Sequence, residues 1–363
     1  MNKFKCFLEG NVDLINQELK NTFLRLKDNF KFDLDNQINV SNLIFDDLYL
    51  LEEFVQRGGK RIRGILVLLS YKLFSDRKVL FQDLIKLAVI TELNHAFLLI
   101  HDDIMDESLK RREKLTLHKT YECLAIKKKI KNSKMYGISK ALVMGDTLNF
   151  ISSKQIFYTG FDDRLKLQLI EKFQNVLLNT CYGQILDYEL NYKDNITKEE
   201  ILNVAKLKTS FYSIQVPIEI GFLVAKGNKK HLPLIQRYSE CLGVAYQLQD
   251  DFLDYKIDDS SGKEIFKDIK EGKNTFIIYN ALNTLKEENL KYLKYCLGNK
   301  NLTLDEGKKL VTLLKVNKVF KKNKEEIDNL IFNAINTIEK SKLNTIQKKY
   351  FIDFANFIMK RKY

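Results

Sequence analysis

Turn-forming residues are scarce in this chain of 363 residues. It contains only two prolines, Pro217 and Pro233, and 15 glycines. Folds rich in strands and loops need more residues that can turn the chain, so this scarcity favours long α-helices. Apolar residues recur at helical spacing, most clearly over residues 83–105, and no strand-like alternation stands out. The sequence therefore predicts an all-α fold.

Other stretches show the same periodicity and predict further helices. They are residues 65–73, 165–187, 198–224, 234–255, 275–285, and one or two helices within 320–361. The stretch 83–105 is long and apolar but contains Lys86, Glu92 and His95, so we expect a buried core helix and no membrane span. We expect one domain over residues 1–363, with a helical region at 1–45 and a Lys-rich loop insertion at 123–138.

One acidic pattern, D-D-x-x-D, occurs twice. The copies are Asp102-Asp103-Ile104-Met105-Asp106 and Asp250-Asp251-Phe252-Leu253-Asp254. Helical residues four apart lie about 40° apart around the axis, so the first and last aspartates of each copy share a face. Such like charges repel, and a divalent cation reverses this; oxygen ligands favour Mg²⁺, Ca²⁺ or Mn²⁺. The alternative is two acidic helix ends on a solvated surface.

Arginine is concentrated upstream of and just after the first acidic copy. Only 10 of the 60 basic residues are arginine, and five of these are Arg57, Arg61, Arg63, Arg111 and Arg112. Arginine binds phosphate in a planar, bidentate manner, so a chain that otherwise prefers lysine retains it where phosphate is bound. For Arg61 itself we expect a solvated helix face.

The sequence offers no obvious nucleophile. It has no Ser/His/Asp or Cys/His constellation, no P-loop and no G-x-G-x-x-G. The chemistry must then come from the substrate: metal ions and basic residues withdraw charge from a diphosphate, and the C–O bond breaks to leave a carbocation. In an apolar cavity, an alkene captures that cation in preference to water.

These motifs resemble the trans-isoprenyl diphosphate synthase family, which contains farnesyl and geranylgeranyl diphosphate synthases. The resemblance runs from about residue 48 to the C-terminus. Its motifs are Gly58-Gly59-Lys60-x-x-Arg63, Glu92-Leu93-x-His95, His101-Asp102-Asp103-x-x-Asp106, Arg111-Arg112, Thr116-x-His118, Gly145-Asp146, Gly183-Gln184-x-x-Asp187, Lys208-Thr209, Tyr246-Gln247-x-x-Asp250-Asp251-x-x-Asp254, Gly262-Lys263, Asp268 and Lys273. The family usually has Gly and then Pro after the arginine pair, where this chain has Glu113 and Leu115.

The resemblance implies an isoprenoid synthase-type helical bundle with a deep central cavity. It also implies head-to-tail condensation of isopentenyl diphosphate with dimethylallyl, geranyl or farnesyl diphosphate. Three Mg²⁺ ions, with Mn²⁺ able to substitute, would be held by Asp102, Asp106 and Asp250, supported by Asp103, Asp251 and Asp254. The allylic diphosphate would be bound by Arg111, Lys208, Gln247 and Lys263. Isopentenyl diphosphate would be bound by Gly59, Lys60, Arg63, His95, Arg112 and Arg361.

Further roles follow from the same resemblance. Thr209, Gln247 and the Lys208 carbonyl would face the developing cation, and the released diphosphate would take the final proton. His95 would be either a ligand or a satisfied core histidine, while we expect structural roles for His101 and His118. For Tyr212, Gln184 and Asp187, lining the site and packing in the core both stay open.

Product length is expected to depend on the residues before the first aspartate. Phe97 and Leu98 should point back along the helix, away from the diphosphate end, and a large Phe97 would act as a floor that stops growth. Ordinary core packing is the other interpretation. In the family that the chain resembles, one aromatic residue here is compatible with either product, which implies farnesyl diphosphate with some geranylgeranyl diphosphate; the ratio and the preferred allylic substrate stay open.

Charge and cysteine content bear on partners and location. The net charge is +13, but the lysines are spread among acidic residues, so we expect no nucleic-acid partner, and the run 127–134 should be an exposed loop or helix end. Five scattered cysteines and an N-terminus without a long apolar stretch predict a cytoplasmic protein, with organelle targeting left open. A homodimer with the first helices at its interface, and inhibition by nitrogen-containing bisphosphonates, follow from the resemblance.

Alternative functions remain at this point. A terpene cyclase, a squalene or phytoene synthase, or a longer-chain polyprenyl synthase would share the fold. Cyclases replace the second aspartate-rich pattern, and non-catalytic subunits tend to lose one of the two, whereas this chain keeps both. A basic helical protein that binds nucleic acid would instead show steeply salt-dependent binding and no diphosphate turnover.

Overall fold

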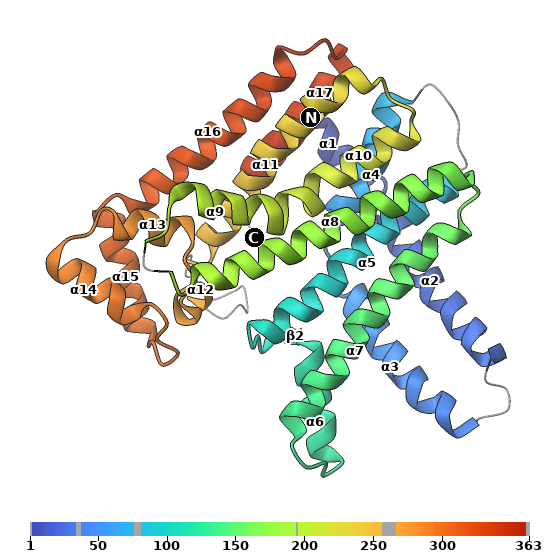
Figure 1. Ribbon diagram of the computed structural model, residues 1–363, viewed down its shortest axis with the longest axis horizontal. Helices are drawn as coiled ribbons and strands as arrows, with labels where there is room; N and C mark the ends of the chain where they lie inside the picture. Colours follow the sequence, from blue (N-terminus) through green and yellow to red (C-terminus); the bar gives the residue numbers. More distant parts are fainter. Residues whose placement is uncertain (1, 34–37, 76–80, 194, 256–265, 361–363) are drawn as a thin grey trace. The chain divides into compact units, whose positions relative to one another are not determined.

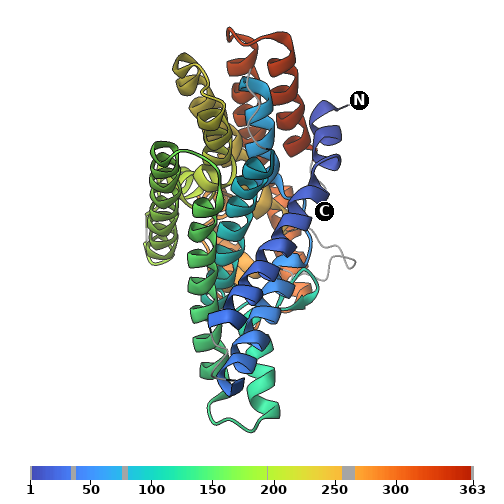
Figure 2. The same ribbon diagram turned by 90° about the vertical axis from the view of Figure 1, so that its right-hand side faces the viewer.

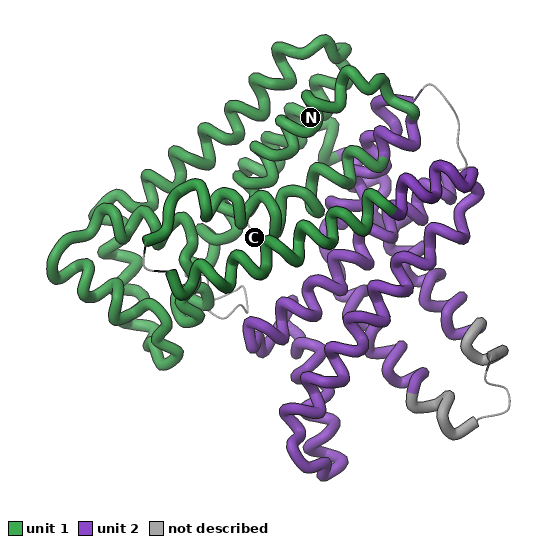
Figure 3. The backbone as a smooth tube through the Cα atoms, viewed as in Figure 1, with its two compact units in different colours: residues 1–5, 171–220, 226–363 green, residues 6–170, 221–225 purple. Residues whose placement is uncertain are grey.

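The computed structural model describes residues 2–33, 38–75, 81–193, 195–255 and 266–360, and helices dominate them (Figure 1). Contacts divide the chain into two compact units (Figure 3). The N-terminal unit comprises residues 6–170 and 221–225, and the C-terminal unit comprises residues 1–5, 171–220 and 226–363. The all-α prediction is confirmed, and the prediction of a single domain stays a prediction.

The N-terminal unit is built around one long helix. Its elements are α1 (Lys3–Glu9, from Cys6 on), α2 (Val12–Asp33), α3 (Ile38–Gln56), α4 (Ile62–Phe74), α5 (Phe81–Met105), β1 (Lys110–Arg111), β2 (Lys114–Leu115), α6 (Leu117–Lys127), α7 (Ser133–Lys154) and the 3₁₀ helix η1 (Gln155–Tyr158). Figures 1 and 2 show α2 running beside α3, and α5 running beside α7.

Helix α5 forms the centre of this unit. Leu87, Ala88, Val89 and Leu93 are fully buried, and α5 packs against α4 and α7. It is long and apolar enough to cross a membrane, but 72% of its most apolar window is buried inside the protein and Glu92 is buried with it. The prediction of a buried core helix over residues 83–105 is therefore confirmed.

The C-terminal unit contains the remaining helices. They are α8 (Asp163–Leu190, from Glu171 on), α9 (Lys198–Ala205), the π-helix η2 (Lys206–Gln215), α10 (Val216–Val224, up to Ile220), η3 (Lys229–His231), α11 (Leu232–Leu253), α12 (Lys267–Glu271), α13 (Phe276–Leu282), α14 (Glu287–Cys296), α15 (Leu304–Val316), α16 (Val319–Glu339) and α17 (Thr345–Met359). Capping boxes at Thr197, Thr303 and Asn344 start α9, α15 and α17.

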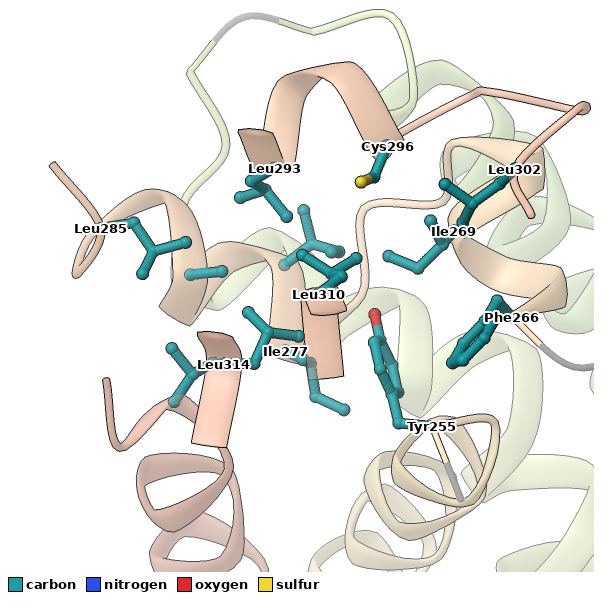
Figure 4. Close-up of a cluster of buried hydrophobic side chains, with 13 residues drawn as sticks. Tyr255, Phe266, Ile269, Ile277, Leu285, Leu293, Cys296, Leu302, Leu310 and Leu314 are labelled. Carbon is teal, nitrogen blue, oxygen red and sulfur yellow. The ribbon is translucent and has the colours of Figure 1, made fainter. Parts of the chain in front are cut away.

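A buried apolar cluster supports the second acidic pattern (Figure 4). Tyr255, the residue after Asp254, is 3% exposed, and Phe266, where the described chain resumes, is 2% exposed. Both pack with Ile269, Ile277 and other apolar residues of α12–α15. The core thus anchors the chain on both sides of residues 256–265.

One predicted loop is shorter in the structure than the sequence suggested. The Lys-rich insertion predicted at 123–138 is mostly helical, because α6 continues to Lys127 and α7 begins at Ser133, which leaves five residues between them. The stretch 320–361 forms two helices, α16 and α17. Apart from the four residues of β1 and β2, the described chain contains no strand, in agreement with the sequence. All five cysteines are free thiols.

Candidate active site

The first aspartate pattern lies at the C-terminal end of α5. The Asp106 amide donates to the Asp102 carbonyl over 2.9 Å, so the helical spacing of these two residues is kept. Asp102 and Asp106 are half-buried, whereas Asp103 is only 1% exposed. The three carboxylates are therefore unequal, and Asp103 faces the protein interior.

Arg111 holds the Asp103 carboxylate from the β1 strand. Its Nε lies 2.8 and 2.9 Å from the two Asp103 oxygens, and its Nη2 lies 2.7 Å from Oδ1 and 3.5 Å from Asp102 Oδ2. Burial alone would lower the pKa of Arg111, but Asp103, Asp102 and Asp106 raise it overall. Arg111 therefore stays charged, in a bidentate geometry that fixes the plane of its guanidinium.

A two-residue turn carries Arg112 at the tip of the β1–β2 hairpin. Arg112 (φ 53°) and Glu113 (φ 65°) both adopt the left-handed region, as in the type I′ turns that suit hairpins. Arg57, directly after α3, donates to the Leu115 carbonyl over 2.6 Å, and Lys114 pairs with Glu53 over 2.6 Å. These contacts fix a hairpin at the place where the sequence departs from the family pattern.

The glycine-rich loop before α4 lies against Arg112. Gly58 (φ 94°) and Gly59 (φ 120°) adopt backbone conformations that side chains disfavour. A Cβ on Gly59 would lie 3.0 Å from Arg112 Nη2, and Arg112 donates a hydrogen bond to the Gly58 carbonyl. Gly59 therefore leaves room for the guanidinium, and Lys60 beside it is exposed.

The expectation that Arg61 lies on a solvated helix face is wrong. Arg61 is 6% exposed, donates to the Asn16 side chain over 2.8 Å and to the Val55 carbonyl over 2.9 Å, and approaches Glu92 at 3.7 Å. Its left-handed backbone (φ 49°) precedes α4 and turns the side chain inward. Arg61 thus supports the loop from beneath.

Glu92 connects this loop to α5. It is 3% exposed, and its Oε1 accepts from the Gly64 amide, in the first turn of α4, over 3.0 Å. A carboxylate at a helix N-terminus is stabilised by the unpaired amides and the helix dipole. The Glu92-Leu93-x-His95 motif therefore places His95 beside the arginine-bearing loop.

His95 lies within a strongly positive environment. Burial, followed by the charges of Arg63, Arg112, Arg111 and Arg61, holds its pKa well below the usual range. Desolvation and the neighbouring arginines also lower the pKa of Arg112, to about 10, so Arg112 stays charged at neutral pH. A neutral imidazole among several guanidinium groups can bind an anion with hydrogen bonds and with charge.

Phe97 contacts His101, the residue directly before Asp102. Phe97 is 8% exposed, and its ring meets His101 edge-on with 5.1 Å between centroids. His101 lies 3.5 Å from Asp146 on α7. A Cβ on Gly145 would lie 2.4 Å from His101 Nε2, so glycine there permits the close approach of α7. Leu98 is half-buried on α5.

The second aspartate pattern closes α11 in the C-terminal unit. Gln247 Nε2 donates to Asp251 over 2.6 Å, and Thr209 Oγ1 donates to Gln247 Oε1 over 2.5 Å. This chain of hydrogen bonds fixes which way the Gln247 amide points, with its oxygen toward Thr209. Asp254, at the end of α11, accepts from the Asp268 amide over 3.1 Å.

Carboxylates crowd around Asp251. Burial, then Asp268, Asp250 and Asp187, raise the pKa of Asp251 well above its usual range, while the hydrogen bond from Gln247 opposes this. Lys208 pairs with Asp187 over 2.7 Å, and Lys273 lies 4.0 Å from Asp268. Because burial and nearby like charges disfavour the charged form, a hard cation would stabilise this set of oxygen ligands.

The Lys208-Thr209 motif lies in a π-helix. η2 interrupts the helix predicted at 198–224, and π-helical turns are rare and frequent at functional sites. Gly183 on α8 lies directly against it, since a Cβ there would be 2.4 Å from the Lys208 amide nitrogen. The sequence signals this packing only through the glycine in Gly183-Gln184-x-x-Asp187.

Comparison with known proteins assigns this chain to a family. The family model described as polyprenyl synthetase matches residues 48–314. The chain belongs to the polyprenyl synthetase family. It is 31% identical, over 84% of its length and 86% of the relative, to a short chain isoprenyl diphosphate synthase of Methanocaldococcus jannaschii. A geranylgeranyl diphosphate synthase of Sulfolobus acidocaldarius is 27% identical over 77% of this chain and 82% of that protein.

Solved structures give the same fold for this polyprenyl synthetase family member. The geranylgeranyl pyrophosphate synthase of Corynebacterium glutamicum, complexed with isoprenyl diphosphate and magnesium, matches with a TM-score of 0.87 over 96% of this chain and 99% of that chain, at 21% identity. The predicted family and enzyme class, a trans-prenyltransferase that elongates prenyl chains, are confirmed.

The structure places the predicted site residues of this family member in two groups. The N-terminal unit contains Gly59, Lys60, Arg63, His95, Phe97, Leu98, Asp102, Asp103, Asp106, Arg111 and Arg112. The C-terminal unit contains Lys208, Thr209, Gln247, Asp250, Asp251 and Asp254. Lys263 and Arg361 lie outside the described residues. Within the described ranges, no three His, Cys, Asp or Glu side chains form a preassembled metal cluster. Glu92, Arg61 and Asp268 join the site as supports that the sequence did not assign.

Proposed function

We propose that this protein condenses isopentenyl diphosphate head-to-tail with allylic diphosphates and releases farnesyl and geranylgeranyl diphosphate. The observation that carries the proposal is the neutral His95 among Arg61, Arg63, Arg111 and Arg112. This group is positive, and its imidazole can donate a hydrogen bond without adding charge. It therefore fits the binding of a diphosphate.

The isopentenyl diphosphate would be bound by Lys60, Arg63, His95 and Arg112. Arg112 is exposed on its hairpin but anchored to the Gly58 carbonyl, so its remaining donors can reach a ligand. Gly59 contributes by leaving space for the guanidinium. Arg361, outside the described residues, would close over this diphosphate.

The allylic diphosphate would be bound with Mg²⁺. We propose that Asp102, Asp106 and Asp250 coordinate up to three ions, which Mn²⁺ could replace, with Asp103, Asp251 and Asp254 in support. The crowded carboxylates around Asp251 fit such a hard cation. Bound ions would withdraw charge from the leaving diphosphate. Arg111, which Asp103 keeps charged and oriented, would also withdraw charge from the leaving diphosphate, together with Lys208 and Lys263.

The resulting cation needs oxygen dipoles near it and little water. Thr209 and Gln247 form one hydrogen-bonded pair, oriented by Asp251, and the Lys208 carbonyl lies in the adjoining π-helix. These groups offer partial negative charge without a nucleophile that would capture the cation. The released diphosphate would then accept the proton lost on forming the new double bond, so no protein base is required.

Product length would be limited by Phe97, with Leu98 beside it. Phe97 is buried against His101 on the helix that carries the first aspartates. An aromatic ring at this depth would stop chain growth after two or three condensations.

The direct test is turnover with defined substrates. Purified protein is incubated with isopentenyl diphosphate and dimethylallyl, geranyl or farnesyl diphosphate, and products are dephosphorylated and sized by chromatography. We expect farnesyl and geranylgeranyl products, loss of turnover in EDTA, and recovery with Mg²⁺. No product, or a metal-independent rate, would refute the proposal; products longer than geranylgeranyl would refute the Phe97 floor.

Calorimetry separates the two diphosphate sites. Asp102→Ala should abolish Mg²⁺-dependent binding of an unreactive allylic diphosphate analogue and leave isopentenyl diphosphate binding intact, because Lys60, Arg63 and Arg112 need no metal. Arg112→Gln is the matched variant and should do the reverse. Equal loss of both ligands in either variant contradicts this division.

We further propose a cytoplasmic homodimer that nitrogen-containing bisphosphonates, as diphosphate mimics, inhibit. Val143, Phe150 and Phe157 are 62%, 71% and 65% exposed at seven-residue spacing along α7 and η1. This apolar stripe supports a dimer interface that includes α7. Light scattering on Phe150→Asp should then report a monomer, and an unchanged dimer would exclude this face.

A further inference from the structure

The turn between α6 and α7 presents a dense group of lysines. We call residues 126–135 the lysine tip. Its lysines are Lys127, Lys128, Lys129, Lys131 and Lys134, all of them exposed. Lys129 (φ 55°) and Asn132 (φ 54°) adopt left-handed backbone conformations, which turn the chain sharply between the two helices. Figure 1 shows the turn at the end of the α6–α7 hairpin, where it projects from the N-terminal unit.

These charges are poorly neutralised. Lys134 pairs with Glu107 over 3.2 Å, and both side chains are 59% exposed, so solvent weakens that pair. For Lys127, Lys128, Lys129 and Lys131, no carboxylate in the described part of the chain lies within 4.0 Å. Residues 126–135 themselves contain five lysines and no acidic residue, so no neighbour in sequence neutralises them.

Apolar side chains are exposed at the same place. Ile126 is 59% exposed at the end of α6, Met135 is 53% exposed at the start of α7, and Ile130 between them is half-buried. Leaving such side chains in water is unfavourable, and neighbouring lysines can extend their charged ends away from an apolar layer. Apolar residues surrounded by lysine are typical of segments that lie at a membrane interface.

The base of the hairpin keeps the tip in place. Lys140 on α7 forms an ion pair with Asp47 on α3 and lies over the ring of Tyr121, which is 2% exposed on α6. The tip is thus the end of a packed hairpin, and its lysines are not required to hold α6 and α7 together.

We propose that the lysine tip docks on the surface of an anionic lipid bilayer. Clusters of four to eight basic residues bind anionic lipid headgroups, and Ile126 and Met135 would enter the interface between them. A nucleic acid fits less well, because residues 126–135 contain no aromatic ring on which a base could stack. Docking would hold a producer of lipid diphosphates at the surface that accepts its product, but the binding itself does not depend on that activity.

Sedimentation with vesicles tests the proposal on the full-length protein. We expect it to bind phosphatidylserine-containing vesicles, to bind phosphatidylcholine vesicles weakly, and to be released by salt. One lysine near such a surface contributes roughly a five-fold change in affinity, so Lys128→Gln, Lys129→Gln and Lys131→Gln together should weaken binding by about 100-fold. Ile126→Ser with Met135→Ser should weaken binding in a way that salt does not alter.

A matched variant controls for a general effect of net charge. It combines Lys291→Gln, Lys294→Gln and Lys308→Gln, and it removes the same charge from exposed positions of α14 and α15 that lie among acidic residues. This variant should bind vesicles like the wild type, and turnover with soluble substrates should be unchanged in both triple variants. Three results would each overturn the proposal. They are an equal loss of vesicle binding in the two triple variants, unchanged vesicle binding by the variant of the lysine tip, and tighter binding of the wild type to single-stranded RNA than to vesicles.

Discussion

Replacing Asp103 should destabilise the protein, whereas the same replacement at Asp102 should remove activity alone. Asp103 is 1% exposed and accepts the Arg111 guanidinium at 2.7, 2.8 and 2.9 Å. The Asp102 side chain is 27% exposed and lies 3.5 Å from the same guanidinium. The two neighbours in one motif therefore differ in what they contribute to folding.

The magnitude follows from this geometry. Removing one partner of a buried ion pair costs about 3–5 kcal/mol, because the other charge stays buried without compensation. The Arg111 side chain is 25% exposed, so water relieves part of this, and Asp103→Asn should cost about 3 kcal/mol, at the lower end of that range. Partly exposed pairs contribute about 0.2–1 kcal/mol, so Asp102→Asn should change stability by no more than that.

Urea unfolding monitored by circular dichroism measures both effects. Asp103→Asn should lower the urea concentration at the unfolding midpoint without changing the dependence of the unfolding free energy on urea. The double variant with Arg111→Gln and Asp103→Asn should lose less unfolding free energy than the two single variants lose in sum. Asp305→Asn, at an exposed position, is the control for losing one carboxylate. If Asp102→Asn and Asp103→Asn lose equal stability, or if the double variant is additive, Asp103 does not position Arg111.

Three further variants test single contacts. Gly59→Ala should raise the KM for isopentenyl diphosphate more than Gly58→Ala does. Both changes impose backbone strain of about 1–3 kcal/mol, but only a Cβ on Gly59 meets Arg112. Equal effects of the two changes on KM would contradict this. Phe97→Ala should lengthen the products, whereas Phe354→Ala, at a buried position of α17, should not; unchanged product length would show that Phe97 is not the floor. Burial lowers the pKa of His118 in the folded protein to about 4. The unfolded chain therefore binds more protons than the folded one between pH 6.5 and 4, and the free energy of unfolding should fall by up to about 3 kcal/mol as the pH is lowered through that window. His118→Asn should flatten this pH dependence, and an equal slope in both proteins would show that His118 is not its source.

Local rules account for what the sequence predicted. The helix over 83–105 follows from apolar spacing alone, and the i, i+4 geometry of Asp102 and Asp106 is kept at the end of that helix. These features depend on residues within two turns of each other, so periodicity captures them.

Features that depend on distant partners were not predictable in this way. The burial of Arg61 depends on Asn16, Val55 and Glu92, which are brought to it only by folding. The π-helix at 206–215 packs against Gly183 on another helix, and nothing within its own sequence distinguishes it from an α-helix. Side-chain pattern fixes the face of a helix, but tertiary contacts decide its hydrogen-bond register and which polar residues are buried.

Each of the two residue groups holds like charges that a ligand of opposite charge would relieve. Around His95, burial and then the charges of neighbouring arginines lower the pKa of Arg112, and an anion would relieve the repulsion between these arginines. Around Asp251, carboxylates raise the pKa of a buried aspartate, and a cation relieves that repulsion. In the proposed function, isopentenyl diphosphate would supply the negative charge at the first group and Mg²⁺ would supply the positive charge at the second.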